Sequence, residues 1–101
     1  RQSRPAAFIV WQTVADESEL HLIATAPESR RLGLAAALMQ CWFEAAAAQS
    51  VRRLLLEVRA ANLPAQNLYR RHGFTECGRR RDYYSLPDGT REDAVLMEKP
   101  C

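Results

Sequence analysis

The sequence is poor in several residue types, and each shortage excludes a class of protein. Its three cysteines show no C-x-x-C spacing, which argues against a disulfide framework or a zinc site and predicts a reducing cytoplasm. Lys99 is the one lysine among 14 basic residues, and the net charge is only +2, so neither nucleic acid nor an anionic membrane is an expected partner. No apolar run approaches the roughly 18 residues that span a bilayer, and no signal peptide is recognisable.

Length and composition point to one domain. The chain has 101 residues, of which 48% are hydrophobic and 26% charged, as is ordinary for a globular fold with a single core. It begins with Arg1 and not with Met, so we expect residues 1–101 to be a single domain that lacks its N-terminal part. The sequence leaves the oligomeric state open.

Hydrophobic patterning predicts seven elements in the order β-β-α-β-α-β-β. The expected elements are strands at 8–14, 20–25, 53–58, 74–82 and 94–98, a helix at 34–49, and a second helix from Pro64 to a Gly73 cap. A turn is expected at 16–18, Cys41 is expected in the core, and the run 53–58 reads as a strand buried on both faces. The strand-helix-strand order implies a right-handed parallel crossover within an α/β layer.

The segment from Arg30 to Ala35 carries the clearest chemical signal. A strand, then two arginines and Gly33, then the start of a helix is an arrangement that holds a pyrophosphate, because helix N-terminal amides and the helix dipole both attract anions. The spacing Arg-x-x-Gly-x-Ala is neither the dinucleotide fingerprint nor a P-loop. The phosphate would therefore belong to another carrier, and the plain alternative is a simple strand-to-helix turn.

Glu57 is a single carboxylate in an otherwise apolar strand. A buried unpaired carboxylate is costly, so Glu57 either pairs, with Arg59 as the nearest candidate, or faces a polar cleft. It lies near the carboxyl end of its strand, where ligands of open α/β sheets bind. A carboxylate acting through water can deprotonate an α-amine, whose pKa is about 7.7–8.0.

Asn62 precedes the short second helix, and Tyr69 lies on it. Asn62 can cap that helix or bind a cofactor. Tyr69 can protonate a thiolate leaving group if the site assists the transfer, and the plain alternative is a core tyrosine.

Two motifs in order resemble the signatures of the GNAT family of N-acetyltransferases: the Arg-x-x-Gly-x-Ala loop, and Asn62-x-x-Ala65-x-x-x-Tyr69-x-x-x-Gly73-Phe74. The segment 56–62, Leu-Glu-Val-Arg-Ala-Ala-Asn, and the charged and aromatic residues of 80–94 narrow this resemblance to the RimI-type ribosomal-protein-alanine N-acetyltransferases.

The resemblance implies a GNAT (acyl-CoA N-acyltransferase) fold, α/β, with a mixed central sheet and helices on both faces. It implies acetyl transfer from acetyl-CoA, without a metal, to the N-terminal alanine amine of protein eighteen of the small ribosomal subunit. Glu57 would be the general base and Tyr69 the general acid. Tyr83, Tyr84 and Glu92 would line the acceptor groove, although hairpin packing is their plainer role. The residues expected to bind acetyl-CoA are Ile23, Ala24, Thr25, Arg31, Leu32, Gly33, Leu34, Ala35, Ala36 and Asn62.

One departure from the family pattern keeps other functions open. GNAT domains of this type begin with a strand, two helices and another strand, and this sequence lacks that part of the acceptor groove. A GNAT enzyme for a small amine or a lysine side chain is one alternative, and a non-catalytic acyl-CoA-binding remnant is another. A nucleic-acid module through Arg79, Arg80 and Arg81 is a third, although a solvated strand end is the plainer interpretation of those arginines.

Overall fold

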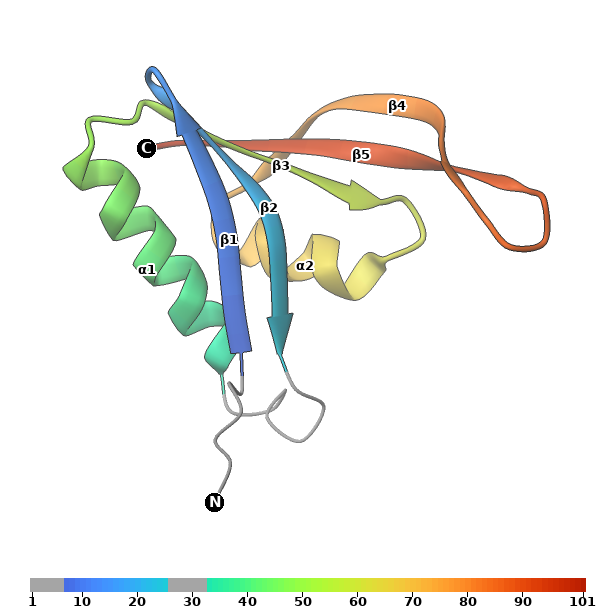
Figure 1. The fold of residues 1–101 in the computed structure, drawn as a ribbon, viewed down its shortest axis with the longest axis horizontal. Helices are drawn as coiled ribbons and strands as arrows, with labels where there is room; N and C mark the ends of the chain where they lie inside the picture. Colours follow the sequence, from blue (N-terminus) through green and yellow to red (C-terminus); the bar gives the residue numbers. More distant parts are fainter. Residues whose placement is uncertain (1–6, 26–32) are drawn as a thin grey trace. The chain divides into compact units, whose positions relative to one another are not determined.

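A computed structural model describes residues 7–25 and 33–101. The chain divides into two compact units, residues 1–52 together with Cys101, and residues 53–100. The elements follow the order β-β-α-β-α-β-β, as predicted (Figure 1). Of the two helices in the described ranges, neither is long and apolar enough to cross a lipid bilayer.

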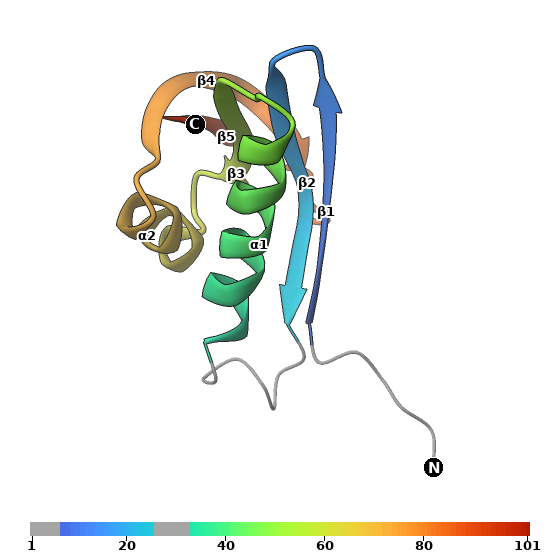
Figure 2. The same cartoon turned by 90° about the vertical axis from the view of Figure 1, so that its left-hand side faces the viewer.

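The first unit is a hairpin covered by a helix. Strands β1 (Ala7–Val14) and β2 (Glu17–Thr25) pair antiparallel, and helix α1 (Leu34–Ala48) lies along one face of the hairpin (Figure 2). The turn is shorter than the predicted 16–18, because Glu17 already pairs with Val14 and only two residues connect the strands. The first of these, Ala15, has a φ of 55°, as the two-residue turns that match strand twist require.

The core of this unit is centred on Trp42. Trp42, Met39 and Ala46 are fully buried, and their spacing places them on one stripe of α1. The Trp42 indole N–H donates to the buried Ser18 hydroxyl at 2.9 Å, so the polar group of this buried ring has a hydrogen-bond partner. The prediction that Cys41 lies in the core is wrong, since its side chain is exposed. One residue corresponds to about 100° of rotation round a helix, which carries position 41 away from the buried stripe.

The second unit is an antiparallel sheet with one helix. Strand β5 (Arg91–Pro100) lies between β3 (Arg53–Arg59) and β4 (Thr75–Ser85), and helix α2 (Leu63–Arg71) connects β3 to β4. Figure 1 shows that β4 bends along its course while β5 runs nearly straight. Strands β4 and β5 extend further toward their connecting turn than predicted, so the turn is shorter. Asp88 closes that turn by accepting hydrogen bonds from the Thr90 amide and hydroxyl.

The two faces of this sheet differ in chemistry. One face carries apolar side chains, each of them at most 6% exposed: Leu54, Leu56, Val58, Val95 and Met97. The other carries cross-strand ion pairs: Arg53–Glu98, Arg80–Glu57 and Arg59–Glu92. The prediction that β3 is buried on both faces is therefore wrong, because its burial alternates and the charged face stays partly open to solvent.

Candidate active site

The start of α1 has a glycine in place of a capping side chain. Gly33 has a φ of 71°, and nothing lies within 4 Å of the point where a Cβ would stand. No side chain caps this helix, its first turn holds no acidic residue, and among the described residues none accepts a hydrogen bond from the amides of Leu34, Ala35 and Ala36. Unpaired amides at the positive end of a helix dipole suit a phosphate group. Of the predicted phosphate loop, Arg31 and Leu32 lie outside the described residues.

The strand segment expected to pair with pantetheine is the end of β2. Ile23, Ala24 and Thr25 pair in register with Ile9, Phe8 and Ala7 of β1. One backbone edge of this segment is thus used by the hairpin. The predicted pairing with pantetheine involves the backbone amides of this segment and not its side chains.

Glu57 lies on the charged face of the second unit. Its Oε1 is 3.1 Å from the Arg80 Nε, and 22% of its side chain is exposed. Arg59, the partner considered from the sequence, instead places its Nη2 2.7 Å from the Glu92 carboxylate. The carboxylate of Glu57 therefore has one basic partner and reaches solvent, as a base that works through water requires.

Two tyrosines of β4 gather beside Glu57. The Arg80 guanidinium lies 5.4 Å from the centre of the Tyr83 ring, and the Tyr83 and Tyr84 rings meet edge to face at 5.1 Å. The pKa of Tyr84 is raised, first by burial and then by the negative charge of Glu57. The structure thus brings Tyr84 near the predicted base and opposite Glu92, and it relates Tyr83 to that base through Arg80.

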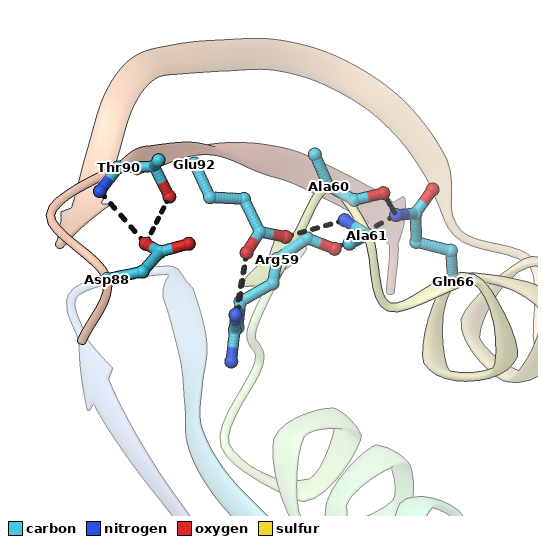
Figure 3. A network of polar contacts seen from close by, with 7 residues as sticks. All are labelled: Arg59, Ala60, Ala61, Gln66, Asp88, Thr90 and Glu92. Carbon is cyan, nitrogen blue, oxygen red and sulfur yellow. Dashed lines mark hydrogen bonds and ion pairs between the residues drawn. The ribbon is translucent and has the colours of Figure 1, made fainter. Parts of the chain in front are cut away.

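Glu92, the third predicted acceptor residue, holds the connection between β3 and α2. Its Oε1 accepts from the Arg59 guanidinium and its Oε2 from the Ala61 amide, both at 2.7 Å. These hydrogen bonds, that from Arg59 first, lower the pKa of Glu92. From the other side, the buried Gln66 of α2 donates to the carbonyl oxygens of Arg59 and Ala60 at 3.0 and 2.9 Å (Figure 3).

Sequence reasoning missed both Gln66 and Arg80. Gln66 is a polar residue three positions before the buried Tyr69, on the same side of α2, and that spacing was its only signal. From the sequence, Arg80 stood out only within an arginine run and the 80–94 segment, because its pairing with Glu57 depends on the register between strands.

Tyr69 lies on α2, and Asn62 is the residue that precedes it. Tyr69 is 6% exposed and packs edge to face against Phe74. Burial raises its pKa, and no described residue hydrogen-bonds its hydroxyl. Asn62 caps the helix, because its Oδ1 accepts the Ala65 amide at 3.2 Å, so the capping alternative is confirmed for that oxygen.

Glu57 and α2 belong to opposite faces of the second sheet. Gly73 ends α2, and a Cβ there would stand 3.0 Å from the Lys99 Nζ. The register places Lys99 on the apolar face, two residues from Met97, whereas Glu57 is on the charged face. Within the described residues, no contact joins Glu57 to Tyr69.

Comparison with known proteins fixes the family. The model of the acetyltransferase (GNAT) family matches residues 2–74. The chain belongs to the GNAT family. It is 42% identical over 100 residues to the [ribosomal protein bS18]-alanine N-acetyltransferase of Escherichia coli K12, covering 99% of this chain and 67% of the relative. The enzyme of the same name from Haemophilus ducreyi is 38% identical over 96 residues, covering 95% and 66%.

Solved GNAT structures show the same fold. The crystal structure of the E. coli ribosomal-protein-S18-alanine N-acetyltransferase has a TM-score of 0.87 at 44% identity, covering 94% of this chain and 61% of that one. Nourseothricin acetyltransferase has a TM-score of 0.86 at 37% identity, covering 95% and 58%. The predicted family and GNAT fold class are therefore confirmed. The chain spans about two thirds of the length of the curated relatives it matches.

Proposed function

We propose that this protein transfers the acetyl group of acetyl-CoA to the N-terminal alanine amine of ribosomal protein bS18, in the cytoplasm. The observation that carries the proposal is the 42% identity, over 99% of the chain, to the E. coli enzyme named for that reaction. The cluster of Glu57 with Tyr83 and Tyr84 supports it, because a carboxylate beside aromatic side chains suits a peptide amine.

Acetyl-CoA would be held by backbone groups of the first unit. The amides of Leu34, Ala35 and Ala36, which have no acceptor among the described residues, would bind its diphosphate, assisted by Arg31 and Leu32. The amides of Ile23–Thr25 would pair with the pantetheine arm as a further strand does. The Oδ1 of Asn62 is used by the cap, so its amide nitrogen would be the donor to the cofactor.

Glu57 would accept the proton of the α-amine through a water molecule. The neutral amine nitrogen then forms a C–N bond to the acetyl carbon, the C–S bond breaks, and Tyr69 donates its proton to the sulfur. The second proton that the nitrogen loses returns through water to the Tyr69 phenolate, and Glu57 releases its proton to solvent. An α-amine has a pKa of about 7.7–8.0 against about 10.4 for a lysine side chain, so Glu57 is better matched to the α-amine. The raised pKa of Tyr69 keeps its hydroxyl protonated, and because a phenol is a weaker acid than a thiol, the site would have to assist the transfer to sulfur.

The placement of the base and the acid on different faces is compatible with this chemistry. The base serves the incoming amine and the acid serves the outgoing sulfur, which are different substituents of the reacting carbon. The thioester would then lie beyond the carboxyl end of β3, with the amine entering from the charged face that carries Glu57.

An acceptor panel tests the proposal. The purified protein is incubated with acetyl-CoA and one of three acceptors: a peptide with the N-terminal sequence of bS18, the same peptide with a blocked N-terminus and an added lysine, or a polyamine. Thiol release gives the rate and mass spectrometry locates the acetyl group. We expect acetylation of the free alanine amine and little of the others. Transfer only to lysine or polyamine, or acetyl-CoA binding by calorimetry without any transfer, would contradict the proposal.

A second candidate is acetylation of a small-molecule amine. The 37% identity to nourseothricin acetyltransferase favours it, since that relative covers 95% of this chain. Adding nourseothricin to the panel separates the two candidates. A kcat/KM for nourseothricin above that for the bS18 peptide would establish the second and displace the first.

A further inference from the structure

Strand β4 is irregular directly opposite Asp93. Arg80 pairs with Ala94 and Tyr84 pairs with Glu92, so the three residues 81–83 face Asp93 alone. Within this bulge, Asp82 has a φ of 53°, in the left-handed region that non-glycine residues seldom adopt. Such a conformation persists only where surrounding groups hold it.

Asp93 and Arg91 hold the bulge from β5. The Asp93 Oδ1 accepts the Asp82 amide at 2.9 Å, and its Oδ2 accepts from the Arg79 Nη1 at 3.3 Å. Arg91 donates its Nε–H to the Asp82 carbonyl at 3.1 Å. The backbone carbonyl of Asp93 also accepts the Ala60 amide at 3.0 Å, just beyond the end of β3.

The bulge decides which side chain stands beside Glu57. Two residues of β4 are extra relative to β5, so Tyr84 is opposite Glu92. In a regular ladder that continued from the Arg80–Ala94 pair, Asp82 would occupy that position. A carboxylate would then stand next to Glu92 and near Glu57 in place of an aromatic ring, and the pair of Tyr83 and Tyr84 would move along the strand.

We propose that Asp93 is a positioning residue for the acceptor: by holding Asp82 in its left-handed conformation, it sets Tyr83 and Tyr84 beside Glu57 and so determines acceptor affinity. This inference rests on the proposed function, because the tyrosine pair matters only if an acceptor amine reaches Glu57. Asp93 itself does not touch the reacting atoms.

The test is a set of substitutions read by two Michaelis constants. Asp93→Ala removes the acceptor of the Asp82 amide, and we expect the KM for the bS18 peptide to rise about tenfold while the KM for acetyl-CoA stays unchanged. Asp93→Asn keeps an oxygen that accepts this amide and should stay close to wild type. Asp88→Ala is the matched control, since among the described residues its carboxylate binds Thr90 in the same hairpin, and it should move neither constant.

A rescue variant separates positioning from general stability. Glycine adopts a left-handed φ without a steric penalty, so Asp82→Gly in the Asp93→Ala background should restore much of the peptide affinity. An unchanged peptide KM in Asp93→Ala, or an equal rise of both constants that Asp82→Gly does not reverse, would overturn the inference.

Spectrophotometric titration of the tyrosines gives a readout that needs no acceptor. Displacing Tyr84 should reduce both its burial and the effect of the Glu57 charge, so its pKa should fall toward the ordinary value of 10.0 in Asp93→Ala and stay raised in Asp93→Asn. If wild type acetylates no N-terminal peptide, the proposed function fails whatever the titration shows. If wild type is active but neither the peptide KM nor the titration changes in Asp93→Ala, the inference alone fails.

Discussion

Helices α1 and α2 begin in opposite ways. At α2, the first amides find partners within the chain: Leu63 donates to the Ala61 carbonyl, Ala65 to the Asn62 side chain, and Gln66 to the Asn62 carbonyl. The remaining first-turn residue, Pro64, has no amide hydrogen to satisfy.

At α1, the corresponding amides are left without partners. Gly33 precedes the helix without a capping side chain, and among the residues described none accepts from Leu34, Ala35 or Ala36. The difference separates a helix start that is part of the scaffold from one that can hold a ligand. The small side chains of Ala35 and Ala36 at the start of α1 keep those amides accessible to an anion.

Placing a carboxylate at each start should give the largest contrast. Ala35→Asp puts a negative charge at the second residue of α1, where it would repel the diphosphate, and should weaken acetyl-CoA binding about tenfold by calorimetry. Thermal stability should not fall, because an acidic residue suits a helix N-terminus. Pro64→Asp, at the same position of α2, is the control and should leave the affinity unchanged. Equal losses in the two variants would remove the distinction between the helix starts.

Replacing two left-handed glycines should separate ligand contact from backbone strain. Gly33 and Gly89 have φ values of 71° and 87°, and nothing lies within 4 Å of the Cβ position of either. Each change to alanine should lower the free energy of unfolding by about 1 kcal/mol, measured by urea denaturation. Only Gly33→Ala should also weaken acetyl-CoA binding, because Gly33 sits at the proposed phosphate site. The account is wrong on this point if both variants keep full affinity.

Asn62 tests whether a cap can also serve the cofactor. Asn62→Ala should cost about 1 kcal/mol of stability through loss of the hydrogen bond to the Ala65 amide. Asn62→Asp should retain the cap, because aspartate is an equally good N-cap, but it loses the side-chain amide donor. We therefore expect Asn62→Asp to keep its unfolding midpoint and to bind acetyl-CoA more weakly. Unchanged binding would restrict Asn62 to the capping role.

The smallest effect concerns Glu92, which supports the connection that precedes α2. Its pKa is lowered in the folded protein, so its ionised form adds stability above the ordinary value of 4.5, and that stability is lost as the pH falls through the lower folded value. Glu92→Gln should reduce thermal stability near neutral pH and flatten its decline below pH 4.5. Melting curves across the acid range check this, and a decline as steep as in wild type would exclude a contribution from Glu92.

Much of the fold followed from local patterns in the sequence. The amphipathic stripe of α1, the Gly33 and Gly73 turns and the order of elements are encoded by residues close in sequence, and the structure agrees with them. The predicted strands of the β4–β5 hairpin stopped too early on the side of the turn. Charged residues such as Arg91 still pair there in the ladder.

The partners within the candidate site could not be predicted in the same way. Glu57 pairs with Arg80 and not with Arg59, and this depends on how β3, β5 and β4 align. Register shifts between Glu76 and Gly78 and between Arg80 and Tyr84 change that alignment. A bulge leaves little trace in a single sequence, because it is stabilised by side chains on the neighbouring strand. The catalytic roles of Glu57 and Tyr69 stay predictions.

The most direct test of the account compares Glu57→Gln with Arg80→Gln in acetyl transfer to the bS18 peptide. Both variants break the 3.1 Å ion pair, but only the first removes the carboxylate. The account predicts that kcat falls at least about 100-fold in Glu57→Gln, most severely at low pH where the amine is largely protonated, and stays near wild type in Arg80→Gln. Equal rates in the two variants would contradict it, because Glu57 would then be only the ion-pair partner of Arg80.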